Sequence, residues 1–458
     1  MKRQDGMANL FARAASSLLA DPPQQADPQA DPDVRSLLEA LGYTAATASG
    51  GHEAEPETRQ RGQLLHAASR FLRVFELAAP DAPGLVSLGA QFDPALADPM
   101  HAGCPVVGVS GVGLSLQDAF QGCIGEGIEY LSQLQTGDDV LVSPGSRDPA
   151  AALGAQSREF LAAFSAHRWR ADAELSWCRA TRITDGGEVL LPADLCLRRP
   201  PAQQQIKPPF ALSTGSAAGT SWDDAALHGL LELIERDAAA LWWRGGRRGK
   251  LIPAGHAAQR AAQARLSRLR QDVTARRSWL LDITTDIGVP CVVAISCRDD
   301  GSGFAFGLAA RPTLTAAAGS AVVEMCQLEL AYAVVDAKRR EGGETALNER
   351  DRLHQRRATA IDADRCLLLQ PVAEPVVHLP IEAADANAVV RLIATRLEQL
   401  GIETFGVDLT RPRLAVPAAR IVAPGLQLEP SELITPRLAA AITQTGGGER
   451  YTGGVLLI

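Results

Sequence analysis

Residues 113–129 read GLSLQDAFQGCIGEGIE, and residues 219–235 read GTSWDDAALHGLLELIE. Each stretch places a serine two residues after a glycine, an Asp-Ala pair three residues after that serine, and then two glutamates three residues apart. A serine followed by an acidic residue in the first turn is typical of a helix N-terminus. The repeat therefore predicts two matched loop-helix units, each with a pair of glutamates on one helical face.

A third, degraded copy follows. Arg311-Pro312-Thr313 precedes a helix-forming stretch that reaches Glu324 and Gln327, so the polar pair is here Glu-x-x-Gln. In all three copies the neighbours of the pair are largely apolar, which indicates partly buried acids. Because a buried carboxylate is unfavourable without a compensating charge, the pattern predicts a cation.

Four glutamates from the two matched stretches are the candidate ligands of that cation, namely Glu126, Glu129, Glu232 and Glu235. Carboxylate oxygens suit Mg²⁺, which typically takes one or two carboxylates and completes its shell with phosphates. The implied ligand is a nucleoside triphosphate. For any single pair, a solvated surface charge cluster is the alternative. The fixed register of the two copies favours the metal or phosphate site.

Composition limits the class of protein. The chain has 458 residues, of which 46% are hydrophobic and 21% charged, enough for extensive cores in one large or two moderate domains. A net charge of −8 and the lack of a continuous basic run argue against a nucleic-acid partner. The densest basic cluster contains Arg244, Arg247, Arg248 and Lys250. It is either a solvated helix end or a contact for a triphosphate or an acidic peptide.

The eight cysteines are scattered without a Cys-x-x-Cys pair, so structural zinc is not expected, and Cys291 is expected to be a small buried thiol. The N-terminus lacks the features of a secretory signal, and no run of 18 apolar residues occurs. We expect a soluble, cytoplasmic protein that does not bind a membrane.

Three regions are expected. Residues 1–35 are a flexible head and a Pro/Asp-rich linker, residues 36–103 a small helical accessory region with a helix over 63–77, and residues 104–458 a catalytic domain. A second repetition relates Leu281-Asp282-Ile283-Thr284 with its following Val-Pro to Val407-Asp408-Leu409-Thr410 with its own. These patterns predict an α/β architecture with approximate internal duplication and a ligand cleft between the related halves.

Several motifs follow one another between about Cys104 and Leu426, namely Gly125–Glu129, Ser213–Gly219, His228–Asp237, Glu324-x-x-Gln327, Asp408–Pro412 and Val416–Leu426. Together they resemble the motifs of the YcaO-domain family. The resemblance implies a YcaO-type fold and a stand-alone cyclodehydratase subunit of azole- or azoline-forming peptide synthetases of the microcin type. Such an enzyme uses ATP and Mg²⁺ to convert Cys, Ser or Thr of a ribosomally made precursor peptide to an azoline. Thioamide or amidine formation and a non-catalytic nucleotide-binding scaffold are the alternatives.

The resemblance also implies roles for individual residues. Glu126, Glu129, Glu232 and Glu235 are metal ligands, and Glu232, Glu235 and Arg236 are catalytic; Ser213, Arg311, Glu324, Gln327 and Arg420 bind the nucleotide. Two features depart from the family pattern. Tyr130 stands where an arginine usually follows the first pair, with Arg311 as a possible replacement, and the C-terminus lacks a proline-rich tail.

The resemblance further implies partners. About 100 residues before Cys104 are too few for a fused leader-binding module, so we expect a separate partner that resembles ubiquitin-activating enzymes (ThiF-like). The precursor peptide is the substrate, and a flavin-dependent dehydrogenase is an optional further partner. A complex or a homo-oligomer is expected.

Overall fold

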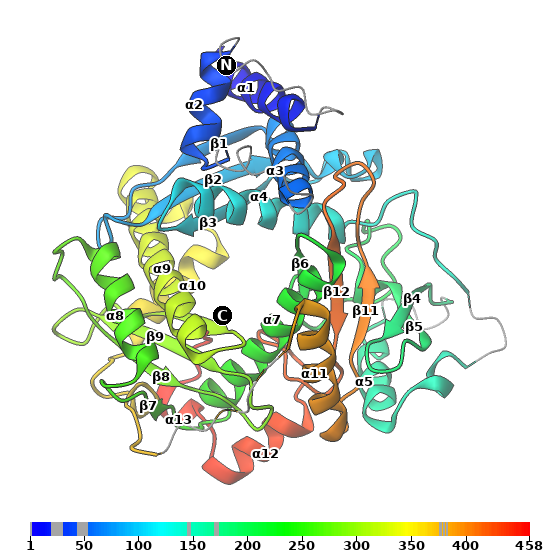
Figure 1. The fold of residues 1–458 in the computed structure, drawn as a ribbon. Helices are drawn as coiled ribbons and strands as arrows, with labels where there is room; N and C mark the ends of the chain where they lie inside the picture. Colours follow the sequence, from blue (N-terminus) through cyan, green and yellow to red (C-terminus); the bar gives the residue numbers. More distant parts are fainter. Residues whose placement is uncertain are drawn as a thin grey trace.

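The computed structural model describes residues 2–19, 31–43, 54–143, 148–168, 174–374, 378, 381 and 383–458. Residues 20–30, which form most of the expected Pro/Asp-rich linker, lie outside the described residues. The elements form an α/β structure in which helices and three sheets surround the centre of the molecule (Figure 1).

Every named strand pair in the described chain is antiparallel. The first sheet contains β1 (Arg73–Glu76), β2 (Val86–Phe92) and β3 (Val107–Gly113). The second has the order β10 (Ala305–Ala310), β9 (Cys291–Cys297), β8 (Arg277–Asp282) and β7 (Lys250–Leu251). The third has the order β5 (Glu188–Pro192), β4 (Trp177–Arg182), β11 (Phe405–Asp408), β12 (Ala418–Val422) and β6 (Ser216–Ala218).

Three long helices, α4 (Leu116–Gln133), α7 (Trp222–Trp243) and α9 (Leu314–Gly342), follow β3, β6 and β10 in the chain and lie around the centre in Figure 1. The other helices are α1 (Lys2–Leu19), α2 (Pro32–Ala40), α3 (Ala54–Ser69), α5 (Ala155–Ser165), α6 (Ala193–Cys196), α8 (Ala257–Arg270), α10 (Glu349–Ala360), α11 (Ala386–Gln399), α12 (Pro436–Thr445) and α13 (Glu449–Thr452).

The second sheet is covered on both faces. Along β9, alternate residues from Cys291 to Cys297 pack into the largest apolar core, which also contains the buried face of α7. Val292 and Ala294 point to the other face and pack with α8 and α9. This alternation explains why every residue of β9 is buried. Cys291 is a buried thiol as expected, and seven of the eight cysteines are buried.

The second repetition of the sequence forms two hairpins, β8–β9 and β11–β12. In each hairpin the aspartate that ends the first strand accepts a hydrogen bond from the N–H two residues later, Asp282 from Thr284 at 2.9 Å and Asp408 from Thr410 at 2.8 Å. Each threonine hydroxyl then accepts a bond from the first residue of the returning strand. The two copies are therefore alike in hydrogen bonding as well as in sequence.

The N-terminal region differs from the expected helix over 63–77. Helix α3 ends at Ser69, and residues 73–76 form β1, because Phe75 packs over Gly89 of the paired strand, where a side chain on the glycine would lie 2.6 Å from the ring. Strands β2 and β3 pair over their whole length across the boundary expected at residue 103. The sheet therefore joins the expected accessory region to the catalytic domain.

One helix, α9, is long and apolar enough to cross a membrane by length and composition alone. Half of its most apolar window is buried inside the protein, and its Glu329 is buried between Arg270 and Arg276 at 2.5 and 3.1 Å. A helix that packs between other elements and carries a buried ionic network is a core helix.

Candidate nucleotide site

The three central helices begin in the same way. Ser115, Ser221 and Thr313 are their N-caps, and each side chain accepts a hydrogen bond from the backbone N–H three residues later. Counted from its cap, each helix carries the first member of its Glu-x-x-Glu or Glu-x-x-Gln pair 11 positions later and the second member 14 positions later. The third copy therefore keeps the register of the other two, although its sequence is the most divergent.

The first member of each pair accepts a hydrogen bond from the backbone of the strand or turn that precedes its own helix. Glu126 accepts a hydrogen bond from the Ser110 N–H at 2.9 Å, and Glu232 accepts one from the Gly215 N–H at 2.9 Å. Glu324 accepts one from the backbone of Leu308. Each helix is thus fixed to its own unit through one carboxylate.

The second member of each pair forms a hydrogen bond with the next loop-helix unit. Glu129 of α4 accepts from the Ala218 N–H of β6 at 3.1 Å, and Glu235 of α7 accepts from the Ala310 N–H of β10 at 3.3 Å. Gln327 of α9 donates to the Ser110 hydroxyl of β3 at 3.2 Å, which returns to the first unit. The three units therefore form a closed cycle of polar contacts. We call its six members, Glu126, Glu129, Glu232, Glu235, Glu324 and Gln327, the carboxylate ring.

Burial and mutual repulsion raise the pKa values in the carboxylate ring. Burial, with smaller contributions from neighbouring ring carboxylates, raises the pKa of Glu129 and of Glu235 to about 8. Burial also raises the pKa of Glu126, against the Ser110 N–H and Arg350, and that of Glu324, against Arg311 and Arg236. Desolvation of the charged form is the common cause.

Among the described residues, Arg236 is the arginine that forms ion pairs with ring glutamates. The Arg236 guanidinium is 3.1 Å from Glu235 Oε1 and 3.4 Å from Glu232 Oε1. Its burial disfavours the charged form, but Glu235, Glu232 and Glu324 outweigh this and raise its pKa. Arg236, with Arg311 and Arg350 acting from beside the ring, supplies fewer positive charges than the five carboxylates can carry, so the ring favours additional positive charge.

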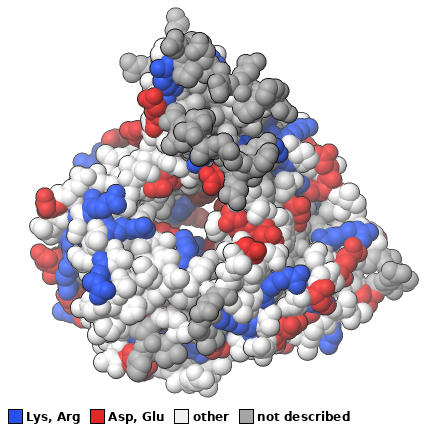
Figure 2. Space-filling model, in the orientation of Figure 1, with Lys and Arg blue, Asp and Glu red and all other residues white. Residues whose placement is uncertain are grey.

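The ring fits a metal that is shared with a ligand. In the described residues no three His, Cys, Asp or Glu side chains are arranged as a complete metal site. However, Glu126 Oε1 and Glu129 Oε2 take part in no hydrogen bond among the described residues, while the other oxygen of each is fixed by a backbone N–H. Mg²⁺ usually binds one or two carboxylates together with water and phosphates, which matches this donor set. The face of the molecule that is seen in Figure 1 is hollowed near its centre, and acidic and basic side chains surround the hollow (Figure 2).

The remaining predicted residues, Arg311, Ser213 and Arg420, lie in or beside segments that contact the ring. Arg311 follows β10, and its guanidinium contacts the Ala310 carbonyl at 2.8 Å, next to the Glu235 contact. Ser213 is exposed in the turn before Gly215. Arg420 is 2% exposed and donates to the carbonyl groups of Leu212 and Thr214. Because these bonds brace the turn from within, the geometry favours a positioning role for Arg420.

Two residues of this region were not found from the sequence. Ser110 uses both its N–H and its hydroxyl in the ring, and only the folded cycle reveals it. Arg350 of α10 acts electrostatically on Glu126. Tyr130, noted in the sequence, occupies the position that Arg236 has in the second unit, and the Arg198 guanidinium lies over its ring at 4.8 Å. A cation next to the first pair therefore comes from distant segments, which a linear motif does not show.

The C-terminal residues pack within the chain. The Val455 carbonyl accepts a hydrogen bond from Trp243 Nε1 at 2.6 Å, and the Leu456 carbonyl accepts one from Arg357 Nε at 3.5 Å. Leu457 is fully buried in the largest core. The apolar ending is thus part of the fold, and the C-terminal end lies near the centre of the view in Figure 1.

The family model described as YcaO cyclodehydratase, ATP- and Mg²⁺-binding, matches residues 110–427. The chain belongs to the YcaO family. This match begins at Ser110 and includes all six members of the carboxylate ring. ATP and Mg²⁺, the cofactors expected from the sequence, are confirmed by membership of this YcaO family.

Known proteins agree with the YcaO assignment. An uncharacterized protein in the tfuA 3′ region of Rhizobium leguminosarum bv. trifolii is 29% identical over 293 residues, which cover 56% of this chain and 61% of that protein. A heterocyclase in complex with substrate and cofactor aligns with a TM-score of 0.65 and 21% identity over 85% of this chain and 55% of that one. The YcaO of Methanopyrus kandleri, bound with AMPPCP and Mg²⁺, aligns with a TM-score of 0.57 and 18% identity. The alignment covers 81% of this chain and 91% of that one.

These comparisons confirm the α/β, YcaO-type fold expected from the sequence. The chain spans less than two thirds of the length of the Rhizobium relative and of the heterocyclase. The likeness to the solved structures is below 25% identity and therefore concerns the fold.

The raised pKa values predict a pH-dependent affinity for Mg²⁺ and nucleotide. With pKa values of about 8, Glu129 and Glu235 are largely protonated at neutral pH in the free protein, and a cation binds only their charged forms. We expect the affinity for Mg²⁺ with a non-hydrolysable ATP analogue to rise between about pH 6 and about pH 8. Binding should release protons, measured by isothermal titration calorimetry in buffers of different ionisation enthalpy.

The folding stability changes with pH in the opposite direction to the affinity for Mg²⁺ and nucleotide. The folded-state pKa values of Glu129 and Glu235 exceed the unfolded values, so the stabilisation is fully present below about pH 4.5 and is lost as pH rises through about 8. Glu129→Gln should reduce the proton release, and Glu188→Gln, at an exposed glutamate, is the control. Equal heats in all buffers for the parent protein would contradict the proposed ligand role of these carboxylates.

Proposed function

We propose that this protein is an ATP-dependent peptide cyclodehydratase. It converts Cys, Ser or Thr of a ribosomally made precursor peptide to thiazoline or oxazoline. The observation that supports the proposal most directly is the carboxylate ring, in which five glutamates, of which Glu235 is buried, form a cycle around Arg236. A scaffold has no need to keep like charges together in its interior.

In this proposal the ring holds the triphosphate through Mg²⁺. The metal ligands are drawn from Glu126, Glu129, Glu232 and Glu235, while Glu324, Gln327, Ser213 and Arg311 contact the nucleotide and Arg420 positions the turn before Gly215. Bound ATP supplies the phosphoryl group that turns the amide oxygen of the peptide into a leaving group. Arg236 lies between Glu232 and Glu235 and is the internal charge that stabilises the developing negative charge.

The catalytic carboxylates can also accept a proton. Attack by a Cys, Ser or Thr side chain on the preceding carbonyl carbon requires loss of the thiol or hydroxyl proton. In the metal-free site burial raises the pKa of Glu235 to about 8, so a Glu235 carboxylate that does not serve as a metal ligand is a base of suitable strength near neutral pH. Glu232 and Glu235 are therefore proposed as catalytic residues together with Arg236.

The partners belong to the same proposal. A separate leader-binding protein that resembles ubiquitin-activating enzymes presents the precursor, and a flavin-dependent dehydrogenase oxidises azolines where azoles are the products. The enzyme acts in the cytoplasm as part of a complex or homo-oligomer. Its free, largely buried thiols suit a reducing compartment.

Mass spectrometry of a reconstituted reaction tests the proposal. The precursor, the leader-binding partner, ATP and Mg²⁺ are incubated with the full chain. We expect the loss of one water mass per modified residue, which requires both ATP and this chain. Cys→Ala variants of the precursor should lose the corresponding mass change.

The alternatives give different spectra. A gain equal to sulfur minus oxygen, dependent on added sulfide, would indicate a thioamide-forming enzyme. Loss of one water that is prevented by acetylation of the peptide amine, and not by replacement of Cys, Ser or Thr, would indicate an amidine. An unchanged precursor mass together with retained nucleotide binding would favour the scaffold and contradict the proposed enzyme.

A further inference from the structure

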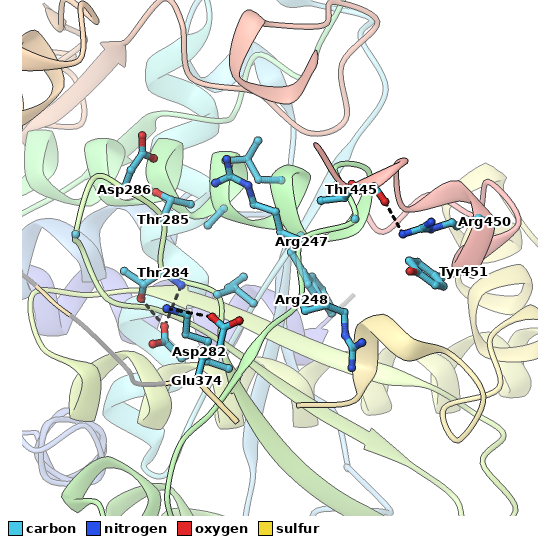
Figure 3. A pocket seen from close by; sticks show the side chains of 17 residues that line it. Arg247, Arg248, Asp282, Thr284, Thr285, Asp286, Glu374, Thr445, Arg450 and Tyr451 are labelled. Atoms are coloured by element: carbon cyan, nitrogen blue, oxygen red, sulfur yellow. Dashed lines mark hydrogen bonds and ion pairs between the residues drawn. The ribbon is translucent and has the colours of Figure 1, made fainter. Parts of the chain in front are cut away.

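A cavity of about 720 Å³ lies at the C-terminal end of α7. Its walls come from α7, the chain that leaves α7, the β8–β9 loop and the segment around α13 (Figure 3). Three residues of the basic cluster identified in the sequence, Arg247, Arg248 and Lys250, line it, and Arg450 joins them from the C-terminal segment. None of these residues belongs to the carboxylate ring.

The acidic residues of the cavity already have partners. Both oxygens of Asp286 bind Arg437, at 2.6 and 3.0 Å, and this contact lowers the pKa of Asp286. Asp282 is held by Thr284 and by His378, and Glu374 is 3.9 Å from Lys250. The carboxylates of the wall are therefore engaged within the protein.

Three guanidinium groups of the cavity are not bound directly by a carboxylate. Among the described residues no carboxylate lies within ion-pair distance of Arg247, Arg248 or Arg450, although Arg247 acts electrostatically on Asp286. Arg450 donates to the Thr445 carbonyl and lies over the ring of Tyr451. Arg248 donates to the Gln370 carbonyl, but its buried Nε has no hydrogen-bond partner in the described part of the chain. A buried donor without a partner is unfavourable, so an added anion or carbonyl oxygen would be stabilising.

The cavity and the carboxylate ring both draw residues from one stripe of α7. Ala238 and Trp242 line the cavity and follow Glu235 by three and seven positions, so the three residues share one stripe of the helix. A rise of 1.5 Å per residue places Trp242 about 10 Å beyond Glu235 along the axis. An extended peptide covers about 10 Å with about three residues.

We propose that this cavity binds an acidic segment of the peptide on which the enzyme acts. This inference rests on the proposed peptide-modifying function. The side-chain carboxylates of the segment pair with Arg247, Arg248 and Arg450, while Thr284, Thr285 and Thr445 line the same walls. The acidic segment would thus bind at the C-terminal end of α7, about 10 Å along the helix axis from Glu235.

The arrangement of the arginines favours spaced carboxylates over a compact polyanion. Arg247 and Arg248 are adjacent in the chain but extend to different parts of the cavity, and Arg450 enters from another side (Figure 3). A triphosphate concentrates its charge in one place, where it would also approach Asp282 and Glu374. An extended chain with separate carboxylates can meet each guanidinium singly.

Binding of a labelled acidic peptide tests the inference. The probe is a capped, fluorescein-labelled peptide of alternating glutamate and glycine, compared with its glutamine counterpart by fluorescence anisotropy without nucleotide. At a low salt concentration of about 50 mM we expect the acidic peptide alone to bind. Arg247→Gln and Arg450→Gln should each weaken binding about tenfold or more.

The controls separate this inference from the proposed function. Arg365→Gln, at an 88% exposed side chain outside the cavity, should bind like the parent. Glu232→Gln should bind the peptide although it lacks ATP turnover. Equal binding of the glutamine peptide, or unchanged binding by both cavity variants, would overturn the inference. Binding of inorganic pyrophosphate in competition with ATP, without binding of the acidic peptide, would assign the cavity to phosphate and also overturn it.

Discussion

Glu232→Gln is expected to lower ATP turnover by about 100-fold to 1,000-fold with little loss of stability. The Glu232 carboxylate accepts from the Gly215 N–H and lies 3.4 Å from Arg236. It also acts electrostatically on Glu126, Glu129, Glu235 and Glu324, that is, on every other glutamate of the ring. The variant removes the negative charge that acts on each of the other four glutamates, while the side chain keeps its shape.

The expected loss concerns turnover rather than folding. Removing a negative charge from a repulsive cluster relieves repulsion in the free protein, so the melting temperature should stay the same or rise. ATP hydrolysis is measured with precursor and partner present, and melting temperature without ligand. Glu126→Gln should behave similarly, because the Glu126 carboxylate has a free oxygen and a fixed one.

Glu188→Gln provides the matched control, because Glu188 is 63% exposed and pairs with Arg179 on the surface. Exposed pairs of this kind contribute little, so this variant should turn over ATP like the parent. If Glu232→Gln consumed ATP at the parent rate, the assignment of the carboxylate ring to metal and phosphate would be wrong.

Much of the ring was predictable from sequence because its elements are local. A cap followed at fixed spacing by two polar residues places both on one helical face, whatever the rest of the fold does. The glutamate pairs of α4 and α7 and the Glu-x-x-Gln pair of α9 were found in this way. Their grouping followed from chemistry, since buried carboxylates need a shared cation.

The contacts that link the three loop-helix units into a closed cycle could not be predicted from the sequence. Glu129, Glu235 and Gln327 bind backbone or hydroxyl groups of the next unit, about 90, 75 and 217 residues away in sequence. Backbone donors carry no residue signature, so neither Ala218 nor Ala310 is marked in the sequence. The helix expected over residues 63–77 was wrong for a similar reason, since pairing with β2 overrides the local apolar spacing.

Gly307→Ala is expected to destabilise the protein by about 3 kcal/mol or more and to weaken nucleotide binding at the same time. Gly307 lies in β10, where α9 crosses at close range. A Cβ at this position would lie 2.1 Å from the Ala321 carbonyl oxygen and 2.2 Å from the Met325 N–H nitrogen. Backbone atoms of a helix cannot move aside singly, so α9 must shift as a unit.

That shift connects stability to the site. Helix α9 carries Glu324 and Gln327, so displacing it from β10 separates Glu324 from Leu308 and Gln327 from Ser110. Affinity for Mg²⁺ with a non-hydrolysable ATP analogue should therefore fall with the midpoint of denaturant unfolding. Gly125→Ala is the control, because its Cβ would meet nothing within 4 Å in α4 and alanine favours a helix by about 1 kcal/mol. Its unfolding midpoint should rise, whereas an unchanged midpoint for Gly307→Ala would show that α9 and β10 are not in close contact in solution.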